Sequence, residues 1–202
     1  MRDIVSLSKV VLTKLENELP DSMFYHSPRH TINVVKNALI LAESEGIKTD
    51  EKELLHVAAL LHDIGFIESR ENHEELSCKI AKEVLSTFNF SIREINYICS
   101  LIKATKLPQR PTDDLAKILC DADLDYLGRE DYFKVADKLF QEFIFFGEIH
   151  SKEEWYQQQI TFLESHQYFT KTAIRLRQNK KADHLLVLRK HLSARIKNNK
   201  ND

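Results

Sequence analysis

Apolar residues recur along this chain at spacings of three and four, which is the period of an amphipathic α-helix. The first such stripe lies within residues 3–18 and consists of Ile4, Leu7, Val11 and Leu15. The same pattern predicts further helices over residues 50–63, 73–88, 91–104, 129–145, 151–168 and 170–196. No segment shows a convincing alternation of apolar and polar residues, the pattern of a half-buried strand. The sequence therefore predicts an all-α fold.

Glycine and proline mark the ends of these segments. Gly46, Gly128 and Gly147 each follow a periodic segment, where a helix commonly ends in a left-handed residue. Ser27 and Pro28 are typical of a helix start, with an N-cap serine before a proline in the first turn. None of these breaks resembles an interdomain linker, and 202 residues suit one substantial domain, so we expect a single domain over 1–202.

Charge is unevenly distributed, although the whole chain carries only −2. Residues 171–202 hold ten Lys or Arg and two acids, a net charge of +8, which leaves −10 for residues 1–170. The basic segment is either a solvated helix face with a frayed tail or a surface that faces phosphate groups. The acidic remainder makes duplex nucleic acid an unsuitable partner, because a groove reader needs a broad basic face.

The cysteines and the N-terminus bear on the compartment. Three cysteines without a CxxC pair are typical of reduced thiols in a cytoplasmic protein. Charged residues interrupt every apolar run of the first 20 residues, unlike a signal peptide. Later apolar runs, such as 143–146, are far shorter than the roughly 20 residues that span a bilayer. We expect a cytoplasmic protein without a membrane partner.

Two motifs combine histidine with a helix end. His26 and His30 surround the start at Ser27, which places His30 in a first turn, where the helix dipole favours a neutral imidazole able to bind a metal. His62 and Asp63 follow the apolar stretch AALL and precede a glycine. Neighbours on a helix point about 100° apart, so these two side chains converge on one ion most easily at the end of the helix.

Two further motifs are rich in acids. Asn72, His73, Glu74 and Glu75 open a predicted helix, where the dipole already accounts for the two glutamates and His73 is a candidate ligand or substrate contact. The stretch DADLD at 121–125 resembles the start of an EF-hand loop. It lacks the glycine at position six and the glutamate at position twelve, so it is a carboxylate cluster rather than a calcium loop.

Taken in order, these motifs resemble the HD-domain metal-dependent phosphohydrolase superfamily. The segments that carry the resemblance are YHSPRH, LLHDIG, NHEELS and DADLDYLG, spread over about residues 20–130. The resemblance implies a helical bundle of HD-domain type over 20–130, with additional C-terminal helices over 131–196. It also implies that His30, His62, Asp63 and Asp123 bind a divalent metal, with Asp121 as the fallback for Asp123. Two-metal members carry a further histidine where this chain has residues 101–105, LIKAT.

Two imidazoles and two carboxylates suit Mn, Fe, Co, Ni or Zn, and Mg is a further candidate. With such an ion the expected activity is hydrolysis of a phosphate ester or anhydride in a nucleotide-like small molecule by metal-activated water. Asp63 is the expected catalytic residue, and Glu68 is a possible base. The candidate phosphate contacts are His26, Arg29, His73, Lys103 and Lys106. The alternatives are a sensor that binds metal and phosphoryl ligands without turnover, and an interaction protein with incidental histidines.

Overall fold

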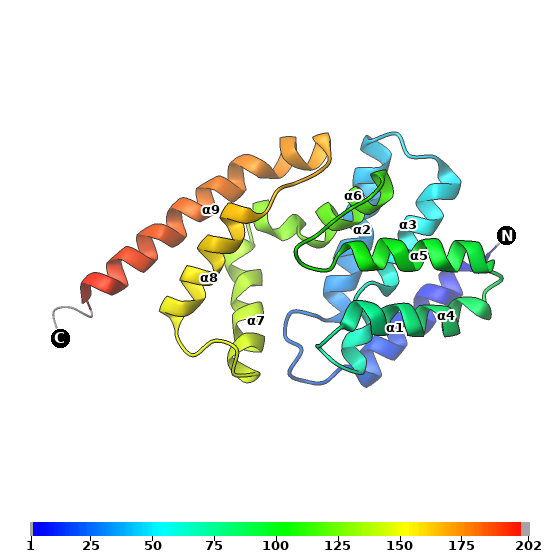
Figure 1. Cartoon of the computed structure of the whole chain (residues 1–202), viewed down its shortest axis with the longest axis horizontal. Helices are drawn as coiled ribbons and strands as arrows, with labels where there is room; N and C mark the ends of the chain where they lie inside the picture. Colours follow the sequence, from blue (N-terminus) through cyan, green and yellow to red (C-terminus); the bar gives the residue numbers. More distant parts are fainter. Residues whose placement is uncertain (1, 199–202) are drawn as a thin grey trace. The chain divides into compact units, whose positions relative to one another are not determined.

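A computed structural model describes the fold of residues 2–198 and the side chains of residues 2–195 (Figure 1). Regular structure in this part of the chain consists of α-helices and two short 3₁₀ helices, which confirms the predicted all-α fold. None of the helices so described is long and apolar enough to cross a membrane. The chain divides after Leu124 into two compact units.

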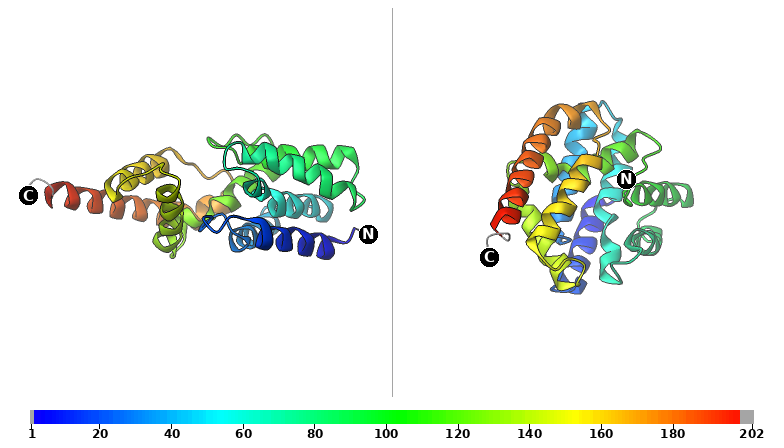
Figure 2. Two further views of the ribbon diagram at one scale, coloured as in Figure 1. Left: turned by 90° about the horizontal axis from the view of Figure 1, so that it is seen from below. Right: turned by 60° about the vertical axis from the view of Figure 1, so that its left-hand side comes forward.

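The first unit holds six α-helices and one 3₁₀ helix, η1. They are α1 (Ile4–Glu18), α2 (Pro28–Ser44), α3 (Thr49–Leu61), η1 (Ile64–Ile67), α4 (His73–Ser86), α5 (Ile92–Ala104) and α6 (Asp114–Asp123). Figure 1 labels the α-helices, and Figure 2 shows the same ribbon from two further directions. α2 packs against α3 and α6, while α4 packs against η1 and α5. α3 therefore lies at the centre of the unit, since it also contacts α1 and α5.

The apolar stripes found in the sequence form the core of this unit. The stripe of α1 buries Leu7, Val11 and Leu15, and α3 is buried almost continuously from Leu55 to Leu61. Each fully buried leucine contributes about 1.5–3 kcal/mol relative to an exposed one. Because α3 is held on several sides, its C-terminal end is a fixed platform for the two residues that follow it.

The second unit consists of η2 (Asp125–Gly128), α7 (Tyr132–Phe145), α8 (Lys152–Ser165) and α9 (Lys171–Asn198). α9 packs against both α8 and η2. Arg177 of α9 forms an ion pair with Asp125, with 2.6 Å between Nε and Oδ1. Nδ1 of His184, also on α9, lies 3.0 Å from the backbone oxygen of Leu127. The basic helix is therefore an integral element of this unit.

The predicted helices are confirmed to within a few residues at each end. No helix was predicted for the residues just before DADLD, yet they belong to α6, which extends to Asp123. Gly46 and Gly147 have the positive φ of a left-handed cap, at 74° and 70°. The same prediction for Gly128 was wrong. A Cβ there would lie 2.4 Å from the backbone oxygen of Arg177, so this glycine allows α9 to approach η2 closely.

Removal of α9 by truncation after Thr170 should lower the melting temperature by at least about 5 °C. The truncation deletes the ion pair between Arg177 and Asp125 and the buried side chains of Ala173, His184 and Leu188. Loss of one buried leucine costs about 1.5–3 kcal/mol, and each kcal/mol shifts the midpoint of a chain this size by about 2–4 °C. Differential scanning calorimetry of the two proteins measures the shift. An unchanged midpoint would identify α9 as a detachable tail.

Candidate metal centre

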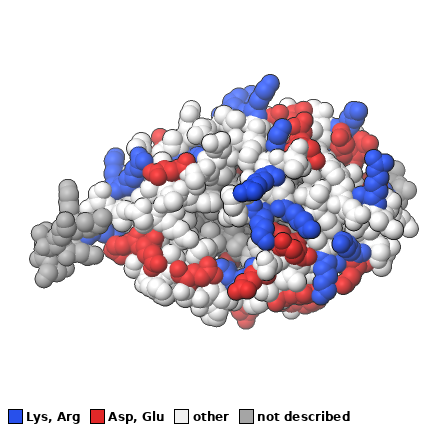
Figure 3. Space-filling model, in the orientation of Figure 1, with Lys and Arg blue, Asp and Glu red and all other residues white. Residues whose placement is uncertain are grey.

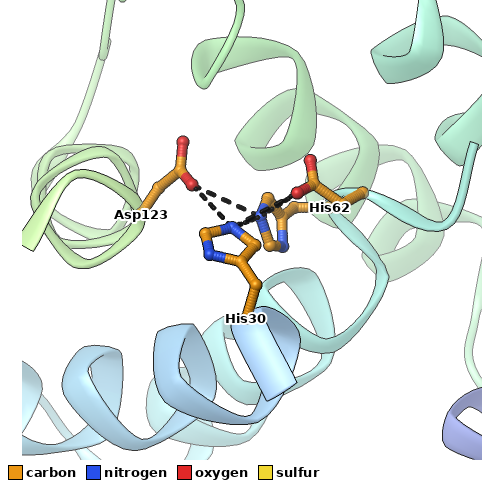
Figure 4. Close-up of side chains that lie close together, drawn as sticks. His30, His62 and Asp123 are labelled. Carbon is orange, nitrogen blue, oxygen red and sulfur yellow. Dashed lines mark hydrogen bonds and ion pairs between the residues drawn. The ribbon is translucent and has the colours of Figure 1, made fainter. Parts of the chain in front are cut away.

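Four of the residues singled out in the sequence meet at one point of the first unit. His30 lies in the first turn of α2, His62 caps the C-terminus of α3, Asp63 follows it, and Asp123 is the last residue of α6 (Figure 4). One nitrogen or oxygen atom from each side chain can be chosen so that all four lie within 4.8 Å of one another. We call these four residues the quartet.

The individual distances show how closely the four atoms approach. Nε2 of His30 lies 3.3 Å from Oδ2 of Asp63 and 3.2 Å from Oδ1 of Asp123. Nε2 of His62 lies 3.1 Å and 3.5 Å from the same two oxygens. The two nitrogens are 3.3 Å apart. Each imidazole therefore lies close to both carboxylates, and the dashed lines of Figure 4 mark these contacts between the side chains.

A backbone contact determines which nitrogen of His62 is available. Nδ1 lies 2.8 Å from the backbone oxygen of Ala59, which can only accept a hydrogen bond. In the neutral ring, Nδ1 therefore carries the proton, and Nε2 presents its lone pair to the other three residues. A second hydrogen bond that fixes the tautomer in this way is common for metal-binding histidines.

Asp63 provides the test of whether a cation fits. Its Oδ2 is buried and has no hydrogen-bond partner among the described residues, although Nε2 of His30 and Nε2 of His62 lie within 3.3 Å of it. Buried carboxylate oxygens without a partner are rare and costly. A cation held by two imidazoles and two carboxylates would satisfy this oxygen, and this set of ligand atoms suits a divalent transition metal. The residues present therefore fit the expected ion.

The charges of the quartet stabilise one another. Burial lowers the pKa of His30 and His62, but the contacts and charges of Asp63 and Asp123 outweigh it, so both pKa values are raised. Burial likewise raises the pKa of Asp123, but the two histidines bring it down to about 2. In the metal-free site the two carboxylates thus act against the neutral form of His30 that the start of α2 was expected to favour. A metal that binds there competes with protons for the same side-chain atoms.

Two further predicted histidines lie beside the quartet, on either side of Phe66. The rings of His26 and His73 each stack on Phe66, with 4.1 Å between ring centroids. Nε2 of His73 is 3.7 Å from Oδ1 of Asp63, and the His26 ring is 6.0 Å from that of His30. The structure thus brings His26 and His73 to the edge of the quartet. Their stacking partner Phe66 was missed in the sequence, where it was only the residue after the HDIG stretch.

Glu74 was also missed as a site residue. It is only 5 % exposed, and its Oε1 lies 3.5 Å from Nε2 of His73. The helix dipole alone explained a glutamate at this position, so Glu74 was not considered as a site residue. The spacing of residues along the helix could have identified Glu74, because it lies on the same buried face of α4 as Ser77, Cys78 and Ala81.

The remaining candidates lie at the surface. Glu68 pairs with Lys79 at 3.2 Å, and both side chains are exposed. Arg29 and Lys103 are exposed as well. Lys106 lies 3.1 Å from Glu75 and 3.9 Å from the buried Glu74, whose Oε1 is also 3.5 Å from Nε2 of His73.

Asp121 was the fallback for Asp123 as the last metal ligand, and the two side chains point in different directions in the structure. Both lie on α6, where two positions correspond to a rotation of about 200°, so their side chains point to nearly opposite sides. Among the described residues, the quartet includes Asp123 and not Asp121.

Comparison with known proteins agrees with this geometry. A family model described as "HD domain" matches residues 29–125, a range that contains all four residues of the quartet. Residues 29–125 of this chain are therefore similar to the HD domain. The four residues that the sequence resemblance implied as metal ligands are the ones that lie together.

Two known proteins are similar to this chain. An uncharacterized protein of Clostridium beijerinckii is 29 % identical over 101 residues, which are 48 % of this chain and 62 % of that protein. A crystal structure described as a predicted HD superfamily hydrolase, from an uncultured Thermotogales bacterium, has 22 % identity and a TM-score of 0.62. The alignment covers 95 % of this chain and 92 % of that one, so the two proteins share a fold.

Proposed function

We propose that this protein is a metal-dependent phosphohydrolase that cleaves a phosphate ester or anhydride of a nucleotide-like small molecule. The observation that carries the proposal is the quartet, in which two imidazoles and two carboxylates meet around a buried oxygen without a hydrogen bond. The similarity to the HD domain supports metal-dependent hydrolysis, and the structural neighbour described as a hydrolase points in the same direction.

The roles within the quartet follow from the contacts. His30, His62, Asp63 and Asp123 would hold the divalent ion, which when bound supplies an activated water and polarises a phosphoryl oxygen. The bond between His62 and the oxygen of Ala59 orients one imidazole before any ligand arrives. Asp123 is more open than the other three, with 17 % of its side chain exposed. This side of the quartet is the route by which we expect substrate to approach.

The groups around the quartet suit a phosphate. The side chain of Ser27 does not cap α2 but donates to the backbone oxygen of Tyr25 at 3.1 Å. The side chain of Ser27 therefore does not cap the N–H groups of Arg29 and His30 at the start of α2, and a helix N-terminus favours anions. His26, Arg29 and His73 lie beside this end of α2 or at the edge of the quartet. We assign them, together with Lys106, to phosphate binding.

Glu74 has the geometry of a positioning residue. It lies 3.5 Å from His73, which contacts Asp63, so it orients that ring toward the quartet. We do not retain Glu68 as the base, because its carboxylate is directed to Lys79 at the surface.

The test is a hydrolysis screen with the metal-reconstituted protein against mono-, di-, tri- and cyclic nucleotides, with phosphate or pyrophosphate release as readout. We expect turnover of at least one class after addition of Mn²⁺, Co²⁺ or Ni²⁺ and none in the presence of a chelator. Nucleotide binding without turnover would reject the enzyme and favour the sensor.

The same preparation tests the substrate class, because we expect a small phosphorylated molecule and no long duplex. Acidic side chains lie directly beside the basic ones on the face drawn in Figure 3, rather than leaving a broad basic stripe. Binding of a 20-base-pair duplex should therefore be weak and fade with salt. Tight duplex binding at physiological salt that free nucleotides fail to displace would contradict the proposed substrate.

A further inference from the structure

Two of the three cysteines face each other across neighbouring helices. Cys78 lies on α4 and Cys99 on α5, which pack side by side in the first unit (Figures 1 and 2). The thiol of Cys78 lies 3.4 Å from the backbone oxygen of Cys99, and the thiol of Cys99 lies 3.6 Å from the backbone oxygen of Cys78. Each sulfur therefore lies against the other residue in a reciprocal arrangement.

The electrostatic surroundings distinguish the two thiols. The side-chain interaction with Cys78 lowers the pKa of Cys99, and Lys82 and Lys103 lower it further, although burial opposes them. The same interaction and burial raise the pKa of Cys78. Cys99 is thus the thiol that ionises first, and the thiolate is the reactive form of cysteine.

Cys120 provides an internal comparison. It is fully buried, and its thiol donates to the backbone oxygen of Ala104 at 3.2 Å. Burial raises its pKa, and the nearby Asp123 and Asp121 raise it further. Cys78 and Cys99 are buried as well, at 4 % and 5 % exposure, so Cys120 differs from them chiefly in its acidic surroundings.

We propose that Cys78 and Cys99 form a redox-active pair that a peroxide converts into a disulfide between α4 and α5. The Cys99 thiolate attacks one oxygen of hydrogen peroxide, the O–O bond breaks, and the departing hydroxide takes up a proton as water, leaving a sulfenic acid on Cys99. The sulfur of Cys78 then attacks the Cys99 sulfur, gives up its proton, and expels a second water as the S–S bond forms. The two thiols lose two electrons and two protons, and the peroxide becomes two waters.

The bond would link positions 21 apart in sequence and close the loop that connects α4 with α5. Closing such a loop restricts the unfolded chain, so the oxidised first unit should be harder to unfold than the reduced one. Reduction by a dithiol should restore the starting state. The quartet contains neither cysteine, so this redox chemistry is measurable whether or not the protein is a hydrolase.

The experiment is titration of the native, reduced protein with hydrogen peroxide, followed by digestion without reductant and mass spectrometry. We expect a peptide pair joined through Cys78 and Cys99, two hydrogens lighter than the separate peptides, at doses that leave Cys120 reduced. The link should disappear on treatment with dithiothreitol. This measurement needs no variant, so it does not depend on whether a substituted protein folds.

Variants then assign the two steps. In Cys78→Ser we expect a sulfenic acid that persists on Cys99 and reacts with dimedone, whereas Cys120→Ser should form the link as readily as the unchanged protein. Absence of the joined peptides under native conditions would overturn the proposal. So would oxidation of Cys120 at the same rate as Cys99, because the thiol pair would then have no special reactivity.

Discussion

Replacement of Asp63 by asparagine should abolish metal binding and, with it, hydrolysis, while the helical content stays unchanged. Oδ2 of Asp63 lies 3.1 and 3.3 Å from the two imidazole nitrogens and receives no hydrogen bond from the described residues. The substitution keeps the size of the side chain but removes its charge. Changes to residues that merely support metal ligands cost about 10–100-fold in affinity or activity, so loss of a ligand should cost more than about 100-fold. Metal analysis, titration calorimetry and circular dichroism measure the three quantities.

His56→Gln is the matched control for this substitution. His56 lies on α3, six residues before His62, and is half-buried and outside the quartet. It should keep the metal content and turnover of the unchanged protein. If Asp63→Asn retained a full equivalent of metal and normal hydrolysis, the quartet would not be the active metal site. If Asp63→Asn lost the metal but the unchanged protein showed no turnover, the metal site would be supported and the enzymatic assignment would be rejected.

The four residues of the quartet were predictable because each carries a local signature. His30 follows a helix start, His62 and Asp63 end an apolar helix, and Asp123 follows an apolar stretch. The packing of a buried helix determines the direction of the polar residues at its end. The position of such a residue in the sequence therefore already restricts where its side chain can point. The family resemblance then rested on the order of all four motifs, because a single His-Asp pair does not identify the other residues of the site.

The surroundings of the quartet were less predictable because they depend on contacts between distant elements. Phe66 stacks on both His26 and His73, which come from opposite sides of it in sequence. Glu68 was favoured by its distance of five residues from Asp63, but the turn of η1 directs it to Lys79 instead. Nearness in sequence failed here because a 3₁₀ turn changes the direction of the chain within four residues.

The contacts of Gly65 with a distant element were likewise not predictable from the sequence. They lead to the second prediction with a large expected effect. The sequence suggested only a helix end, but Gly65 lies within η1, where this short helix meets the start of α4. A Cβ at this position would lie 2.1 Å from the backbone oxygen of His73 and 2.7 Å from the backbone nitrogen of Ser77. The N–H of Gly65 also donates to Oγ of Ser77 at 2.8 Å. The absence of a side chain is what allows α4 to bring His73 and Glu74 to the quartet.

Gly65→Ala should therefore destabilise the protein by about 1–3 kcal/mol, the usual cost of overpacking a well-filled core. The atoms in the way belong to the backbone and cannot rotate aside, so α4 must move away from η1. None of the quartet lies on α4, so we expect the metal content to persist while KM rises, because His73 is displaced. Thermal unfolding, metal analysis and steady-state kinetics test the three parts.

Gly46→Ala separates the steric effect from the general cost of replacing a glycine. Gly46 has a φ of 74°, and a Cβ there would meet nothing within 4 Å, so its replacement costs only the roughly 1–2 kcal/mol of a left-handed backbone. That variant should lose some stability but keep the KM of the unchanged protein, because Gly46 follows α2 at the end opposite His30. Equal KM values for the two variants would mean that α4 does not position His73 for substrate. A higher KM for Gly65→Ala alone would tie substrate binding to the close contact between η1 and α4.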